Sequence, residues 1–139
     1  MNKETYESNT GLRIVATLID YILIFCFTIV YMYQLGEPSE DGGVKVSGLK
    51  GLVPFLFWFL YLPICEWKFC STLGHWTVGL KVIAENGEEL TIGQTIKRRL
   101  SDIIDISWCF GLVAFIVVKS TDKKQRVGDI IAKTLVVKK

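Results

Sequence analysis

Residues 12–33 read LRIVATLIDYILIFCFTIVYMY, and this stretch decides the class of fold. The twenty residues from Ile14 to Tyr33 contain one charged side chain, Asp20. About twenty apolar residues are what an α-helix needs to cross the hydrocarbon of a bilayer. The stretch is apolar on nearly every side, whereas a surface helix of a soluble bundle keeps a polar face. It therefore predicts a transmembrane helix over 12–33.

Two charged residues interrupt this apolar helix, and their spacing places them on the same face. Arg13 and Asp20 are seven residues apart, which places them on one helix face, about 10 Å apart along the axis. An ionisable residue in a membrane segment usually faces a protein interior or a wet cavity and has a partner there. Two interpretations stay open, namely an arginine at the membrane interface with a structurally satisfied aspartate, or a functional pair.

The composition agrees with a membrane protein. Half of the 139 residues are apolar and 12% are aromatic, and the mean hydropathy is +0.38. A chain of this length supplies one small helical domain and not two. We therefore expect residues 1–139 to form a single, mainly α-helical membrane domain.

A second span is expected over 51–67, an aromatic stretch bracketed by Lys50 and Lys68. Its prolines, Pro54 and Pro63, lie near its ends, where the loss of a backbone hydrogen bond matters least. The residues between the two spans are rich in glycine, which predicts a short flexible loop.

A third apolar helical segment is expected over 101–118. Its uncharged part, 106–118, has thirteen residues, which suits a re-entrant or a short, tilted span. Three full crossings would divide the Lys and Arg residues seven to nine, whereas two crossings with a re-entrant segment leave fourteen on one side and two on the other. The positive-inside rule favours the second arrangement, with the N- and C-termini cytoplasmic in a multi-pass membrane protein.

A small cytoplasmic β-element is expected between the second and third apolar segments. Residues 78–92 alternate around Asn86-Gly87, the strongest short-range signal for a β-hairpin. The β-branched run 135–137, in the basic tail 119–139, offers a possible third strand. Such pairing requires the hairpin and the tail to lie on the same side of the membrane.

The chain also resembles a known family. The blocks RIVATLID at 13–20, TLGHWTVGLKVI at 72–83, KRRL at 97–100 and QRVGDIIAKTLVV at 125–137 are similar, in order, to those of the RDD family of bacterial membrane proteins. The resemblance implies that Arg13, Asp20 and Asp129 are the family-signature polar residues. It also raises cation/proton antiport, which has been proposed for some members.

Motifs for other chemistry are missing from the sequence. A single histidine, His75, excludes a multi-histidine metal site, and there is no catalytic triad spacing or phosphate-binding loop. We therefore expect no metal, no cofactor and no enzymatic activity. The basic segments 97–99 and 119–126 adjoin apolar segments in a chain of net charge +2, which favours anionic lipid headgroups over nucleic acid as their partner.

Two hypotheses for function remain. In the first, the Arg/Asp set fixes helix packing in a small accessory, assembly or oligomer-forming membrane component. In the second, Asp20, Asp102 and Asp105 form an ion or proton site of a cation/proton antiporter, which would need a homo-oligomer or another membrane partner because two crossings enclose little space. Under either hypothesis we expect Arg13 to bridge to Asp129 or to the Asp102/Asp105 face, and Asp20 to be held by another segment.

Overall fold

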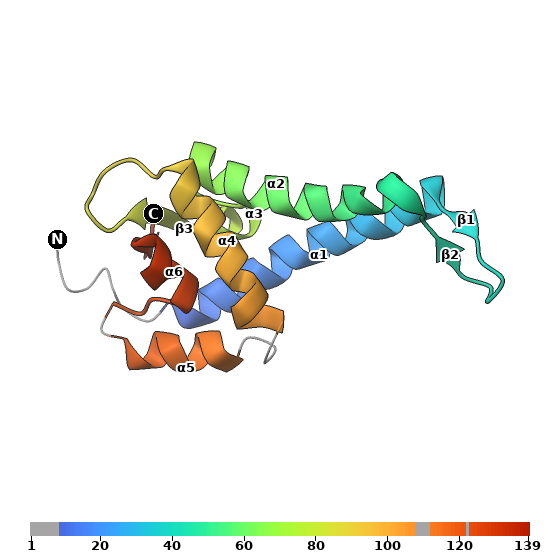
Figure 1. Ribbon diagram of the computed structural model, residues 1–139. Helices are drawn as coiled ribbons and strands as arrows, with labels where there is room; N and C mark the ends of the chain where they lie inside the picture. Colours follow the sequence, from blue (N-terminus) through green and yellow to red (C-terminus); the bar gives the residue numbers. More distant parts are fainter. Residues whose placement is uncertain (1–8, 108–111, 122) are drawn as a thin grey trace.

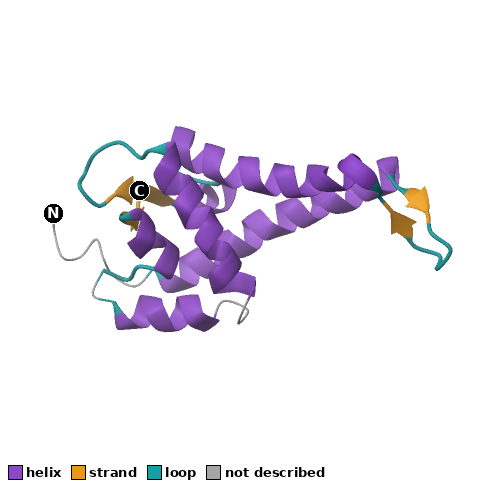
Figure 2. Cartoon of the chain, viewed as in Figure 1, coloured by secondary structure: helices purple, strands orange, loops and turns teal. Residues whose placement is uncertain are grey.

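The structure is a computed structural model that describes residues 9–107, 112–121 and 123–139, without the side chains of 104–107 and 112–115. Helices dominate it, and the strands are short (Figure 2). Two long helices form an extended antiparallel pair, and the remaining helices gather at one end of that pair (Figure 1). The molecule is therefore elongated, with a wide end that holds the C-terminus and the first described residues (Figure 1).

The antiparallel pair consists of α1 (Thr10–Leu35) and α2 (Val53–Phe69), with a 3₁₀ turn at Gly48–Leu52 leading into α2. Two stretches, 26 residues in α1 and 22 from the turn through α2, are long and apolar enough to cross a membrane. Aromatic rings line the seam between them, where Phe27 stacks on Phe57 with their centroids 3.9 Å apart. The two predicted spans are thus helices that pack against each other.

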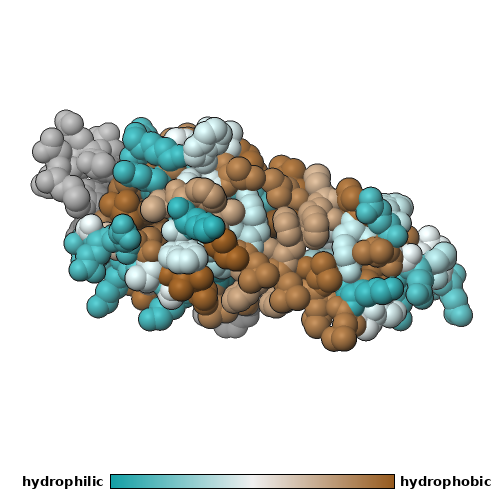
Figure 3. All heavy atoms as spheres, turned by 90° about the horizontal axis from the view of Figure 1, so that it is seen from above, coloured by the Kyte–Doolittle hydropathy of each residue, from teal (hydrophilic) through white to brown (hydrophobic). Residues whose placement is uncertain are grey.

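The narrow end of the molecule is a small hairpin in place of the flexible loop expected there. Strand β1 (Glu37–Pro38) pairs antiparallel with β2 (Val44–Lys45). Figure 3 shows hydrophilic residues gathered toward both ends of the molecule, with hydrophobic residues broadest between them. Large apolar side chains on the outer faces of both long helices are exposed, including Phe25 and Phe55. Such an exterior fits lipid contact and not water.

The wide end contains α3 (Leu73–Thr77), β3 (Leu80–Ala84), α4 (Ile92–Ser107), α5 (Leu112–Ser120), α6 (Val127–Ala132) and β4 (Thr134–Lys138). Strands β3 and β4 pair antiparallel, from Leu80 opposite Lys138 to Ala84 opposite Thr134. The inward side chains of this ribbon form a small apolar core, in which Leu80, Val82 and Leu135 are almost fully buried. The C-terminal strand therefore closes the fold onto a segment more than fifty residues earlier.

The predicted hairpin over 78–92 is wrong in its second strand. The chain does turn at Asn86-Gly87, where Gly87 has a φ of 79°, but the residues after this turn form no strand and α4 begins at Ile92. Thr91 and Gln94 explain the helix start, because the Thr91 hydroxyl accepts from the Gln94 N–H at 3.3 Å while the Gln94 amide accepts from the Thr91 N–H at 3.0 Å. This reciprocal capping box commits 91–94 to a helix, and β4 becomes the partner of β3.

The predicted third segment over 101–118 is divided between two helices. Its first residues continue α4, its last residues form α5, and residues 108–111 lie outside the described part of the chain. Figure 1 shows α4 crossing over the long pair, and α5 running back along the axis of that pair toward the wide end. The described helices therefore do not form one continuous apolar rod.

Candidate functional site

The interior of the wide end is unusually rich in charge. Arg13 of α1 forms an ion pair with Asp129 of α6, and its other nitrogen donates to the Lys124 carbonyl at 2.7 Å. Asp129 also pairs with Arg98 of α4, and it accepts from the Arg126 N–H at 3.0 Å, which caps the start of α6. Asp129 therefore joins α1, α4 and α6 through a single carboxylate.

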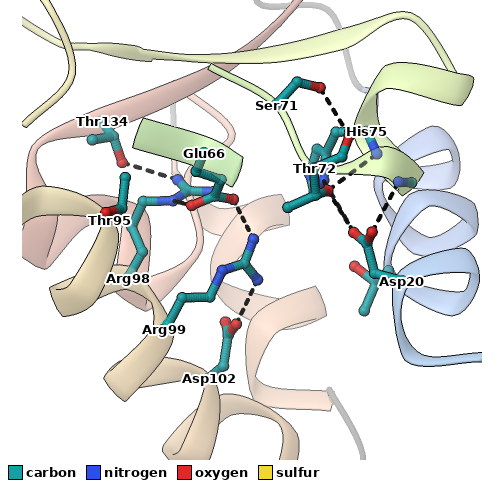
Figure 4. A network of polar contacts seen from close by, with 12 residues as sticks. Asp20, Glu66, Ser71, Thr72, His75, Thr95, Arg98, Arg99, Asp102 and Thr134 are labelled. Atoms are coloured by element: carbon teal, nitrogen blue, oxygen red, sulfur yellow. Dashed lines mark hydrogen bonds and ion pairs between the residues drawn. The ribbon is translucent and has the colours of Figure 1, made fainter. Parts of the chain in front are cut away.

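Glu66 extends this set of contacts into α2. Arg98 donates to the Glu66 carboxylate from Nε at 3.2 Å, and to the Thr134 hydroxyl of β4 at 2.9 Å. Arg99 pairs with the other side of Glu66. Both Arg98 and Glu66 are fully buried. Neighbouring arginines on α4 thus hold a carboxylate of α2 between them (Figure 4).

The far end of the set lies at Asp102. Arg99 donates to Asp102 Oδ2 at 2.8 Å, and Arg126 Nη1 lies 3.4 Å from Asp102 Oδ1. Cations and anions therefore alternate along a continuous series, which we call the ion-pair network. Its members, in order, are Arg126, Asp102, Arg99, Glu66, Arg98, Asp129 and Arg13.

The protonation states of the network follow from these neighbours. Burial alone would raise the pKa of Asp129, but the guanidiniums of Arg13, Arg98 and Arg126 hold it well below its usual range. Burial would likewise lower the pKa values of Arg99 and Arg126, but the adjoining carboxylates raise both. Asp129, Arg99 and Arg126 are therefore ionised at neutral pH.

Asp20 occupies a separate pocket, the Asp20 pocket, in which no described lysine or arginine forms an ion pair with it. Its Oδ2 accepts from the Thr72 hydroxyl at 2.5 Å, and its Oδ1 accepts from the Gly74 N–H at 2.8 Å and from the Tyr61 hydroxyl at 3.1 Å. Asp20 is 2% exposed. The carboxylate is thus held by α2 and by the first turn of α3, which lies on α1.

The single histidine completes this pocket. His75 Nδ1 lies 2.8 Å from the Thr72 hydroxyl oxygen, and 3.7 Å from Asp20, which is too far for a hydrogen bond. Because the Thr72 hydrogen points to Asp20, we assign the His75 Nδ1–H as the donor to Thr72. Burial lowers the pKa of His75 and outweighs the pull of Asp20 in the opposite direction, so the ring is neutral at pH 7.

Close contact between α1 and α3 depends on Gly74. A Cβ at this position would overlap the carbonyl oxygen of Ala16 and would lie 2.8 Å from the Asp20 carboxylate. Only glycine lets the α3 backbone approach α1 closely enough for its N–H to reach Asp20.

The structure brings together some of the predicted site residues and separates others. The predicted contact of Arg13 with the C-terminal half is present, with Asp129 as its partner. Asp102 lies in the ion-pair network and not with Asp20, and the side chain of Asp105 is outside the described residues. Asp20 and Arg13 therefore belong to different sites although they share a helix.

Sequence reasoning missed the residues that hold Asp20. Thr72 is the N-cap of α3, and its hydroxyl accepts from the His75 N–H at 3.3 Å. The signal available was the Thr72-Leu73-Gly74 stretch just after an apolar segment, which is typical of a helix start. Within the described residues, no group of three or more His, Cys, Asp or Glu could hold a metal ion.

The fold and the site together define a class of protein. Two apolar helices long enough to cross a membrane carry a compact end that is held together by buried arginines and acids. This is an α-helical membrane protein. The chain belongs to the RDD family, whose sequence profile matches residues 8–133.

One relative is similar to the chain along most of its length. The chain is 40% identical over 136 residues to a protein of Bacillus subtilis (strain 168) named "Uncharacterized protein YxaI", and the match covers 91% of this chain and 88% of that one. No solved structure matches the chain significantly. The comparisons thus identify the family and leave the activity to be inferred from the site.

Proposed function

We propose that this protein is a structural membrane component, in which the ion-pair network locks four segments together to present a rigid cytoplasmic end to a membrane partner or to a second copy. The observation that carries this proposal is the alternation of the network, which links α1, α2, α4 and α6. Buried ion pairs favour this arrangement of the segments, because separating them would leave buried charges unpaired. An accessory or assembly role needs such rigidity.

The same geometry argues against catalysis. The acids and arginines of the network are bound to one another, and Asp20 accepts three hydrogen bonds. A general acid, a base or a nucleophile must instead meet a substrate. We therefore propose a non-enzymatic role.

We further propose that the protein crosses the bacterial inner membrane twice, with both termini cytoplasmic. The antiparallel pair carries the β1–β2 hairpin at one end and every described element after α2 at the other (Figure 1). The hairpin end holds two of the sixteen Lys and Arg residues, so the positive-inside rule makes the wide end cytoplasmic. In this arrangement α4 and α5 enter and leave on one side, and exposed lysines of the tail meet anionic lipid headgroups.

Cysteine accessibility tests this topology. Single cysteines replacing Gly42, Asn86 and Lys139, in a variant without the native cysteines, should react differently with an impermeant reagent added from outside. We expect Gly42→Cys to be labelled and the other two to be protected. Labelling of both Gly42→Cys and Lys139→Cys from outside would indicate three crossings and contradict the re-entrant arrangement.

A flux assay tests the structural role against cation/proton transport. The purified protein is placed in liposomes and assayed for sodium- or potassium-dependent proton movement, with Asp20→Asn as the comparison. We expect flux equal to that of empty liposomes for both proteins. Robust flux that Asp20→Asn abolishes would overturn the structural proposal and make Asp20 an ion or proton site.

A further inference from the structure

Helix α3 presents large apolar side chains at the surface. Gly74 is buried against α1, whereas Leu73 and Trp76, three positions apart, are exposed. Trp76 is 65% exposed, although the burial of so large a ring is strongly favourable. The last turn of α2, just before α3, also exposes Trp67 and Phe69. Exposed apolar side chains that cluster in this way mark interaction surfaces, and we call these four residues the α3 belt.

The level of α3 along the long helices follows from its contact with α1. The Gly74 N–H donates to Asp20 at 2.8 Å, and a Cβ on Gly74 would overlap the Ala16 carbonyl. Tyr33, another exposed aromatic residue, lies near the opposite end of α1. At about 1.5 Å per residue, Asp20 and Ala16 lie about 20 to 26 Å from Tyr33. The hydrocarbon core of a bilayer is about 30 Å thick, so with Tyr33 at one boundary α3 lies within about 10 Å of the other.

The surroundings of α3 are basic. Lys139 Nζ lies 5.4 Å from the centroid of the Trp76 ring, and the Lys139 N–H donates to the Gly79 carbonyl at 2.8 Å, which fixes this lysine beside α3. The segments 67–84 and 130–139, which include α3, β3 and β4, contain five lysines and no Asp or Glu. A second copy of the chain would bring its own lysines against these, whereas anionic headgroups compensate them. The charge therefore favours an anionic lipid leaflet as the partner of this surface.

We propose that the α3 belt and Lys139 form an interfacial anchor for anionic phospholipid, with Trp76 between the headgroups and the acyl chains and Lys139 paired with a lipid phosphate. Tryptophan is enriched at this level of membranes, because its ring is apolar and its indole N–H bonds to headgroups or water. The anchor sets how deeply the two long helices are inserted. The inference rests on the proposed crossings by α1 and α2, and it holds for either orientation of the protein in the membrane.

Fluorescence quenching by brominated lipids tests the depth of Trp76 in the full-length protein in vesicles. A variant that keeps Trp76 as its single tryptophan should be quenched more by bromines near the headgroup than by bromines near the end of the acyl chain. A variant that keeps only Trp58, near the middle of the apolar stretch 48–69, should show the reverse order. A tryptophan replacing Glu89, in the exposed loop before α4, is the reference for water and should be quenched by acrylamide and not by lipid.

The headgroup of the brominated lipid tests the preference for anionic lipid. At equal mole fraction, brominated phosphatidylglycerol should quench Trp76 more than brominated phosphatidylcholine does, whereas Trp58 should show no preference. Lys139→Gln should lower the relative affinity for phosphatidylglycerol beside Trp76 about fivefold, which is the effect of one lysine near a membrane surface. Lys45→Gln is the matched control, because it removes an exposed lysine from the hairpin at the other end of the long helices and should leave the preference unchanged.

The outcomes can overturn the inference separately from the proposed crossings. The anchor is wrong if Trp76 behaves like the tryptophan at position 89, which would place α3 in water, or if it is quenched at the same depth as Trp58. It is also wrong if the two headgroups quench Trp76 equally, or if Lys45→Gln acts as strongly as Lys139→Gln. Absence of lipid quenching at Trp58 would instead contradict the crossings by α1 and α2, and would overturn both proposals.

Discussion

Arg13 and Asp20 are both buried on one face of α1, yet the protein compensates their charges in opposite ways. Arg13 meets the carboxylate of Asp129 and a carbonyl oxygen. Asp20 meets two hydroxyls and a backbone N–H, and no arginine or lysine among the described residues lies within ion-pair distance of it. Two charges two turns apart on one helix can therefore depend on different physical interactions.

The ion-paired site and the hydrogen-bonded site should respond differently to mutation. A buried ion pair that loses one member leaves an uncompensated charge, which is strongly destabilising. An anion held by hydrogen bonds can be replaced by a neutral group of the same shape, provided that the donors find new acceptors. Asp129 and Asp20 are the matched residues for this comparison.

The largest effect is expected at Asp129. Asp129→Ala leaves both Arg13 and Arg98 without this carboxylate, so the free energy of unfolding should fall by about 3 to 5 kcal/mol, and Arg13→Ala should lower it by less. The double variant should be close to Asp129→Ala alone. Reversible unfolding in mixed micelles measures all three. Losses that simply add would show that the two residues are not coupled.

A second, smaller effect is expected where α3 meets α1. Gly74→Ala introduces a methyl group against the Ala16 carbonyl and the Asp20 carboxylate. The helices must separate, so we expect a loss of about 1 to 3 kcal/mol in the same unfolding measurement. Gly93→Ala is the control, because a Cβ there meets nothing within 4 Å. Equal stability of the Gly74→Ala variant and the unmodified protein would contradict the close approach.

The sharpest comparison replaces each aspartate with asparagine. In Asp20→Asn the amide NH₂ can donate to Thr72, whose hydroxyl can then donate to His75 Nδ1, so the loss should be about 1 kcal/mol or less. Asp129→Asn removes the counter-charge of two guanidiniums and should be much more destabilising. Similar losses in unfolding free energy at the two positions would remove the distinction drawn between the sites.

The smallest effect concerns pH. Burial lowers the pKa of His75 below its unfolded value of about 6.5, so the unfolded chain binds this proton first on acidification. The stability that a neutral His75 contributes is therefore present above about pH 6.5 and is lost as the pH falls below that value. In His75→Asn the side-chain amide can replace Nδ1–H but does not titrate. The free energy of unfolding should therefore change less with pH between neutral and mildly acidic conditions. An unchanged slope would assign the pH dependence to other groups.

The local sequence predicted those elements whose structure depends mainly on one property, such as hydropathy. The two apolar helices were predictable from hydropathy, because lipid-facing segments are apolar on nearly every side. The hairpin over 78–92 was not, although Asn86-Gly87 does turn. Residues 91–94 could form either a strand that pairs with β3 or a capped start of a helix. In the structure they start α4, and β4 from the C-terminal end of the chain pairs with β3 instead.

The sequence by itself determined the membrane class, the family and the order in which apolar stretches alternate with basic segments. These properties follow from composition and from order along the chain. Tertiary structure decided which charge meets which. Arg98 and Glu66, 32 positions apart, and Arg13 and Asp129, 116 apart, come into contact only when α1, α2, α4 and α6 pack together. Charge pairing acts through space over a few ångströms, and a linear sequence does not record those distances.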